Sequence, residues 1–76
     1  MYITISIEAE GRRNRISIDE RQHVSAAFAI LRARGMAKKD PAPALYKSVL
    51  LDEWIQADQT FKDQGIVSGD LLIAQR

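Results

Sequence analysis

The stretch TFKDQGIVSGDLL, Thr60–Leu72, decides the fold because it sets a polar turn immediately before the last apolar run of the chain. Thr60 can cap a helical turn with its hydroxyl, and Asp63 follows three positions later, as in a shortened capping box. Phe61 and Ile66 are the apolar residues that would fix this turn to a core. The stretch therefore predicts a single helical turn that controls where the last strand enters the sheet.

The second half of the same stretch predicts a reversal and a strand. Ser68, Gly69 and Asp70 are residue types that favour tight turns. The apolar segment Leu71–Ala74 comes directly after them. We therefore expect a final strand that begins as soon as the chain has reversed.

Strict alternation marks the N-terminus as a β-hairpin. From Tyr2 onward polar and apolar residues alternate, which is the period-two pattern of a half-buried strand. The residues of the buried face are Ile3, Ile5 and Ile7. Glu10–Asn14 supplies the glycine and polar residues of a turn, after which Ile16 and Ile18 resume the alternation.

The period then changes to that of a helix. Apolar residues recur at i, i+3, i+4 and i+7 on an alanine-rich segment, and they are Val24, Ala27, Phe28 and Leu31. Basic residues crowd the C-terminal end, where they favour the helix dipole, and Gly35 can adopt the left-handed cap conformation. One helix that ends near Gly35 is therefore expected.

The next part of the chain predicts a connection and two strands. Two prolines within residues 37–44 indicate an extended crossing from helix to sheet. Leu45–Leu51 predicts a third strand, whose facing stays open because LYKSVLL does not alternate cleanly. Asp52–Asp58 is consistent with a short edge strand or turn, in which Trp54 would cover the margin of the core.

The length and composition of the chain indicate a single domain over residues 1–76. With 46% hydrophobic and 28% charged residues it is typical of a globular protein. A net charge of +1 is too balanced for a general nucleic-acid binder, and no apolar run approaches the roughly 20 residues of a membrane span. The sequence has no cysteine, which excludes disulfides and thiolate sites and suits a reducing cytosol. We therefore expect a cytoplasmic protein with no nucleic-acid partner and no membrane insertion.

Neither catalysis nor metal binding is indicated by residue spacing. His23 is the only histidine, and no acid or nucleophile has a spacing that would orient it as a general base. The acidic residues lack the spacing of a metal-binding loop; they are Asp19, Glu20, Asp52, Glu53 and Asp63. We therefore expect no enzyme activity, no metal and no cofactor.

The order of the elements resembles the ubiquitin-like β-grasp family along essentially the whole chain. The resemblance is carried by the opening Met-x-Ile-x-Ile, the spacing from Ile18 to Val24, and the run Thr60-Phe61-x-Asp63-x-x-Ile66. It implies an α+β fold with a mixed four- to five-stranded sheet, one main helix and a short helical turn. It also implies that the last strand enters the centre of the sheet.

Two shorter features resemble a narrower group. The spacing Ile-x-x-Gly-Asp-x-Leu over Ile66–Leu72 and the helix entry His23-Val24 are similar to the small bacterial YukD/EsaB-type proteins that accompany type VII secretion. Conjugation of a ubiquitin-like protein needs a slim tail that ends in Gly-Gly, whereas this sequence ends with LIAQR. A conjugated modifier or sulfur carrier is therefore not expected unless the natural chain is longer.

The resemblance also implies a binding face. If Leu72 faces the helix, Leu71 and Ile73 project from the opposite side of the sheet. Tyr2 would lie on that same side, and exposed apolar area of this kind commonly marks a contact surface. In ubiquitin this face carries the recognition patch, and the alignment places Tyr46 at its central isoleucine and Ile73 at its histidine.

The hairpin carries the densest run of basic residues, Arg12, Arg13 and Arg15. Arg12 and Arg13 are expected to orient an acidic partner by their charge. Charged residues at a hairpin tip also keep a small domain soluble, and this is the simpler interpretation.

The sequence thus predicts a non-catalytic protein-interaction module, a cytoplasmic accessory of bacterial type VII secretion whose protein partner docks on the open sheet face. A second copy of the chain could cover the same face and form a homodimer. The alternatives are a small regulatory or scaffolding subunit of a multicomponent enzyme, and a ubiquitin-like modifier without its diglycine tail.

Overall fold

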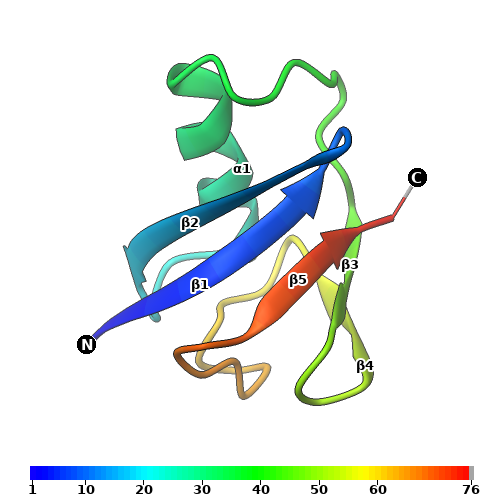
Figure 1. Cartoon of the computed structure of the whole chain (residues 1–76). Coiled ribbons are helices and arrows are strands. Elements are labelled where there is room, and N and C mark those ends of the chain that lie inside the picture. Colours follow the sequence, from blue (N-terminus) through cyan, green and yellow to red (C-terminus); the bar gives the residue numbers. More distant parts are fainter. Residues whose placement is uncertain (76) are drawn as a thin grey trace.

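One mixed sheet of five strands, in the order β2-β1-β5-β3-β4, forms the base of the molecule in the computed structural model, which describes residues 1–75. The strands are β1 (Tyr2–Ala9), β2 (Arg12–Asp19), β3 (Leu45–Ser48), β4 (Glu53–Gln56) and β5 (Leu71–Ala74). β5 is parallel to β1 and antiparallel to β3. The last strand therefore occupies the centre of the sheet between two hairpins, as predicted (Figure 1).

The first hairpin, β1–β2, is closed by the shortest kind of turn. Ala9 pairs with Arg12, so only Glu10 and Gly11 connect the strands. Their φ angles of 54° and 74° are both left-handed, which is the requirement of a type I′ turn. The turn is tighter than the loop expected, because β2 already begins at Arg12.

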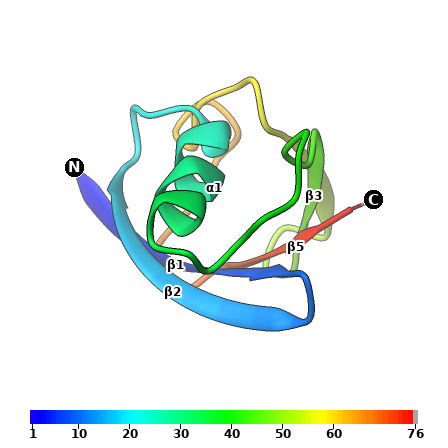
Figure 2. The ribbon, with the colours of Figure 1, turned by 90° about the horizontal axis from the view of Figure 1, so that it is seen from above.

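A single helix, α1 (Val24–Ala33), lies across the concave face of the sheet (Figure 2). The four residues of its predicted apolar stripe are its buried residues. The helix ends at a left-handed Gly35 with a φ of 74°. Met36 N–H donates to the Leu31 carbonyl at 2.8 Å and Gly35 N–H to the Arg32 carbonyl at 3.0 Å, the pair of bonds of a Schellman cap. The predicted end of the helix is confirmed.

The polar turn before β5 forms around Thr60 and two buried apolar side chains. Asp63 N–H donates to the Thr60 hydroxyl oxygen at 3.0 Å, although the Asp63 carboxylate makes no return bond within residues 1–75. Phe61 and Ile66 are buried, and Ile66 N–H donates to the Phe61 carbonyl at 3.0 Å. The turn is therefore fixed to the core at both ends, as the sequence indicated.

The reversal that follows attaches the chain to β1. Gly69 N–H donates to the Thr4 carbonyl at 2.8 Å, and Thr4 N–H donates to the Ser68 hydroxyl oxygen at 3.0 Å. Gly69 has a φ of 92°, a conformation that favours glycine. These bonds place the start of β5 beside the middle of β1.

The hydrophobic core lies between α1 and the inner face of the sheet. Its members are Ile3, Ile5, Ile7, Ile16, Ile18, Val24, Ala27, Phe28, Leu31, Ala37, Tyr46, Ile55, Ala57, Phe61, Ile66 and Leu72. All apolar residues that the alternation and the helical stripe placed inside are among them. A strand or helix with the wrong phase would expose several of these side chains. Each large one that is exposed would lower the free energy of unfolding by about 1.5–3 kcal/mol.

The outer edge of β4 is closed by one side chain. Gln56 N–H donates to Gln64 Oε1 at 2.7 Å, and Gln64 Nε2 donates to the Gln56 carbonyl at 2.9 Å. The carboxamide thus makes the two bonds that a neighbouring strand would make. Edge strands are sites of unwanted pairing, and Gln64 blocks this one at the C-terminal end of β4.

Gln64→Ala is expected to lower the free energy of unfolding by about 1–3 kcal/mol, because two hydrogen bonds to the Gln56 backbone are lost. Denaturant unfolding measures this loss, and amide exchange at Gln56 should become faster. Gln59→Ala is the control, since the Gln59 side chain is exposed. Unchanged exchange at Gln56 in the Gln64 variant would contradict the assignment.

Candidate protein-binding surface

The face of the sheet opposite α1 carries a row of side chains that crosses all five strands. Strand register places Arg13 of β2 opposite Glu8 of β1, and Glu8 opposite Ile73 of β5. Ile73 is then paired with Lys47 of β3, and Lys47 with Trp54 of β4. We call this side the open face.

The apolar part of the open face lies over β5, β3 and β4. Leu71 and Ile73 are half-buried there, while Leu72 between them is fully buried against the helix side. Val49 extends this area because its N–H donates to the Leu71 carbonyl at 3.0 Å. Trp54 is 58% exposed and Val49 51% exposed. The open-face patch is defined as Val49, Trp54, Leu71 and Ile73.

Lys47 lies in the middle of this patch and orients Trp54. Its Nζ atom is 5.0 Å from the centroid of the Trp54 ring and 3.2 Å from Asp52 Oδ1. A cation over an indole ring contributes about 0.5–1 kcal/mol at an exposed site. The Trp54 ring is therefore held in a fixed orientation within the patch, where a partner can contact it.

Two of the sequence-based placements on β3 and β4 are wrong. Tyr46 was expected at the centre of the open face, but it is fully buried on the helix side with Ile55 and Ala74 as its strand partners. Lys47 occupies the outward position instead, because the strand phase differs by one residue from the one that the alignment assumed. Trp54 was expected to cover the core margin and is exposed on the opposite face.

The other predicted residues are distributed over different sides of the molecule. Leu71 and Ile73 lie on the open face as expected. Tyr2 is also outward and 70% exposed, but it lies beyond the end of β5, whose pairing with β1 starts at Ser6. Arg13 lies on the open face, and its guanidinium donates to Glu8 Oε1 at 3.0 Å.

Arg12 is not part of the open face. It is at the hairpin turn and lies one residue out of phase with Arg13, so it belongs to the other side of the sheet. It lines a groove at the hairpin end of the sheet together with Glu10 and Lys39, and this groove also reaches Glu8 and Ile73 of the open face. The Glu10 carboxylate accepts the N–H groups of Lys38 and Lys39 at 2.9–3.0 Å. These bonds lower the pKa of Glu10.

Tyr46 buries its hydroxyl without a hydrogen-bond partner in the part of the chain that the structure describes. Burial raises the pKa of Tyr46 to about 12. The neutral phenol is the form that the folded state prefers, and the pKa of an unfolded tyrosine is about 10. The part of the folded-state stability that depends on a protonated Tyr46 phenol is therefore fully present below about pH 10 and is lost as the pH rises through about 12.

Tyr46→Phe is expected to leave stability at pH 7 unchanged or to raise it by up to about 2 kcal/mol, because an unsatisfied buried hydroxyl is removed. Between about pH 10 and 12 the wild type should lose stability relative to the variant. Denaturant unfolding at a series of pH values measures both effects. Tyr2→Phe is the exposed control and should keep the wild-type loss. Destabilisation of Tyr46→Phe by more than about 1 kcal/mol at pH 7 would show that the hydroxyl is bonded.

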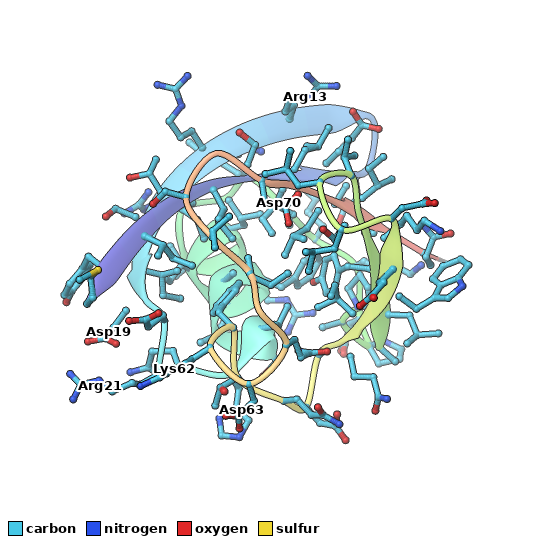
Figure 3. All side chains as sticks on the ribbon, turned by 90° about the horizontal axis from the view of Figure 1, so that it is seen from below. Arg13, Asp19, Arg21, Lys62, Asp63 and Asp70 are labelled. Atoms are coloured by element: carbon cyan, nitrogen blue, oxygen red, sulfur yellow. The ribbon has the colours of Figure 1, made fainter. Side chains whose placement is uncertain are left out.

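A buried carboxylate, Asp70, supports the loop beside the patch. It is 1% exposed and accepts the Ser48 hydroxyl at 2.5 Å, Leu50 N–H at 3.1 Å and Leu71 N–H at 2.7 Å. Ser48 Oγ in turn accepts Leu51 N–H at 3.1 Å. Figure 3 shows Asp70 within the ring of loops, whereas Asp19 and Arg21 lie at the rim. The sequence indicated Asp70 as a turn residue and as part of the Gly-Asp motif in Ile66–Leu72, but not as a buried acceptor. Its partner Ser48 could not be identified from the sequence, because the facing of Leu45–Leu51 stayed open.

Asp70→Asn is expected to lower the free energy of unfolding by about 2–4 kcal/mol, because an amide group cannot accept all of these donors and one bond is to a buried hydroxyl. The carboxamide keeps one oxygen for the Leu50 and Leu71 N–H groups, but its NH2 group cannot accept the Ser48 hydroxyl in place of Oδ2. Amide exchange at Leu51 should become faster, because its N–H donates to the Ser48 hydroxyl oxygen, which loses its own acceptor. Chemical denaturation and exchange measured by NMR test both effects. The matched control is Asp58→Asn, which removes an exposed carboxylate. Equal stability of the two variants would exclude a structural role for Asp70.

No cluster of three metal-ligating side chains is formed within residues 1–75. His23 is the N-cap residue of α1, its side chain makes no capping bond, and it is exposed. No helix in this part of the chain is long and apolar enough to cross a membrane.

Comparison with solved structures confirms the ubiquitin-like β-grasp fold. A de novo designed protein based on ubiquitin superposes with a TM-score of 0.72 at 15% identity, over 97% of this chain and 87% of the other. The ubiquitin-like domain of Plasmodium falciparum Dsk2 gives 0.64 at 15% identity, over 99% and 100%. The EccD5 ubiquitin-like domain from Mycobacterium xenopi gives 0.59 at 14% identity, over 99% and 93%. No protein-family model and no curated protein sequence matches the chain.

Proposed function

We propose that this chain is a non-catalytic protein-interaction module that binds a protein partner through the open-face patch. The observation that carries the proposal is the set of apolar side chains on the side of the sheet that the core does not use. Leu71 and Ile73 could be polar without loss to the core, because Leu72 alone supplies the buried side chain at this place. Apolar side chains gathered on an exposed face, here around Lys47, are typical of a contact surface.

The chemistry of the patch fits an interface centre with a polar rim. Trp54 offers a large side chain whose ring is already oriented by Lys47, and tryptophan is enriched among the residues that dominate binding energy. The ion pair between Arg13 and Glu8 lies on the same face, at the other side of Ile73. Rim charges of this kind fix the orientation of a partner more than they add affinity.

For the biological setting we propose a cytoplasmic accessory of a bacterial type VII secretion system. Two observations support this narrower proposal. The sequence resembles the YukD/EsaB-type proteins at Ile66–Leu72 and His23-Val24. The fold is also that of the EccD5 ubiquitin-like domain from Mycobacterium xenopi.

Trp54→Asp and Ile73→Asp are each expected to weaken partner binding more than tenfold, because an interface centre tolerates a desolvated charge poorly. The partner is first identified by in-cell cross-linking in the native host, and the two purified proteins are then titrated by calorimetry. Trp54 is the only tryptophan of the chain, so its fluorescence in the wild type should shift to the blue as the partner excludes water.

Ala29→Asp is the matched control, because it places the same charge at an exposed position of α1 on the opposite side of the molecule. All three variants must keep the wild-type circular dichroism spectrum. Wild-type affinity in both patch variants would rule out the open-face patch. A wild-type chain that is dimeric by sedimentation, and monomeric in both patch variants, would assign the patch to self-association.

A further inference from the structure

The balanced net charge of the chain conceals a separation of charge in space. Residues 8–15 and 32–40 hold seven basic and three acidic residues, a net charge of +4. The other residues from 1 to 75 hold three basic and seven acidic residues, a net charge of −4. Five of these seven acidic residues lie within residues 49–53 and 57–70.

The two groups lie at opposite ends of the molecule. Figure 1 shows the β1–β2 turn, the C-terminal end of α1 and the connection that follows α1 together at the top of the view. The β3–β4 turn and the loops before β5 lie at the bottom. The protein therefore has a positive and a negative end, although its net charge is only +1.

Most basic side chains of the positive end have no ionic partner. The ion pairs within residues 1–75 use Arg13, Arg21, Lys47 and the terminal amine as cations. Five exposed basic residues of the positive end form no ion pair in this part of the chain. We call these five residues the basic end, and they are Arg12, Arg32, Arg34, Lys38 and Lys39.

The two lysines of the basic end are held in place from two sides. The Glu10 carboxylate in the hairpin turn accepts the backbone N–H groups of Lys38 and Lys39 at 2.9–3.0 Å. From the helix, the Arg32 guanidinium donates to the Lys39 carbonyl and lies 5.4 Å from the centroid of the Phe28 ring. Three segments that are distant in the sequence are thus joined here. The cations do not have to be gathered when a ligand binds, which lowers the entropic cost of binding.

This grouping of like charges does not stabilise the fold. Like charges repel one another, and the surfaces of small domains usually intersperse both signs. The Glu10 carboxylate beside the cluster bonds to backbone N–H groups and not to a guanidinium or ammonium group. A ligand with many negative charges would relieve the repulsion, so the basic end is suited to binding one.

The arrangement of the cations favours a broad charged surface over a narrow ligand. Arg12 and Lys39 line the groove at the hairpin end, whereas Arg34 and Lys38 are exposed outside it. Met36 is 39% exposed and lies between these two residues in the chain, where it adds an apolar side chain that can lie among lipid headgroups.

No exposed aromatic side chain accompanies the basic end. Proteins that bind single-stranded nucleic acid stack the bases on such side chains. The exposed aromatic residues within residues 1–75 are Tyr2 and Trp54, which lie at the start of β1 and on β4. The chemistry of the basic end therefore fits acidic lipid headgroups better than an unpaired nucleic-acid strand.

We propose that the basic end docks this protein on the surface of an anionic lipid bilayer, without insertion of a chain segment. The five cations face the acidic headgroups, and the negative end points away from the bilayer, which sets a single orientation. Each basic residue close to such a surface strengthens binding by about fivefold. This surface is separate from the open-face patch and does not depend on the function proposed for it.

The test is co-sedimentation of the full chain with vesicles of phosphatidylcholine that contain about 30% phosphatidylglycerol. The protein should bind these vesicles, fail to bind pure phosphatidylcholine, and dissociate as the salt concentration is raised, because salt screens the attraction. Phosphatidylserine at the same fraction should bind equally, since the charge of the headgroup is what is recognised. The fluorescence of Trp54 should not shift, because Trp54 lies outside the basic end.

Lys38→Gln is expected to weaken vesicle binding about fivefold, and the double variant Arg34→Gln, Lys38→Gln about twentyfold to thirtyfold. The matched control is Lys62→Gln, which makes the same change of net charge at an exposed, unpaired lysine of the negative end as the structure describes it for residues 1–75. This control should retain wild-type binding. All three variants should keep the wild-type circular dichroism spectrum, because none of these side chains makes a hydrogen bond within residues 1–75.

Three results would overturn the proposal. They are equal binding to vesicles with and without the anionic lipid, equal weakening by Lys38→Gln and Lys62→Gln, and a blue shift of Trp54 fluorescence on the vesicles, which would place the open-face patch in the bilayer. Binding of a polyglutamate peptide or a single-stranded oligonucleotide, without binding to anionic vesicles, would assign the basic end to a different polyanion.

Discussion

The structure depends on the insertion of β5 between β1 and β3. The two hairpins do not pair with each other, so the sheet is continuous only through this short strand. Its register also determines what each face carries, because Leu72 enters the core while Leu71 and Ile73 remain on the open face. The core and the candidate binding surface are therefore products of the same strand pairing.

Polar contacts at the start of β5 secure this insertion. Ser68 and Gly69 bond to the backbone of Thr4 on one side, and Asp70 bonds to Ser48 on the other. A buried carboxylate is costly unless its acceptors are satisfied, and here three donors surround it. The Asp70 carboxylate also accepts the Leu50 N–H in the turn after β3. It thereby fixes the position of the neighbouring Val49 in the open-face patch.

The molecule is asymmetric in how it treats its exposed surfaces. Within residues 1–75, the Gln64 side chain occupies the backbone of Gln56 at the C-terminal end of the β4 edge, whereas no side chain bonds to the outward backbone of β2. The open face is likewise mixed, with an apolar area over β5 and ion pairs around it at Arg13 and Lys47.

The sequence by itself determined the hairpin and the helix, because periods of two and 3.6 residues are local patterns with one face buried. It also determined the turn before β5, because the capping Thr60 and the apolar Phe61 and Ile66 are local signals. The outward positions of Leu71 and Ile73 were implied by the resemblance to ubiquitin-like proteins, and the strand register confirms them. Only the tertiary structure decided the facing of β3, where Tyr46 is buried and Lys47 is exposed. A strand of four residues with a polar Ser48 inside carries no clear alternation, so its phase is set by pairing with β4 and β5 and by the burial of Asp70.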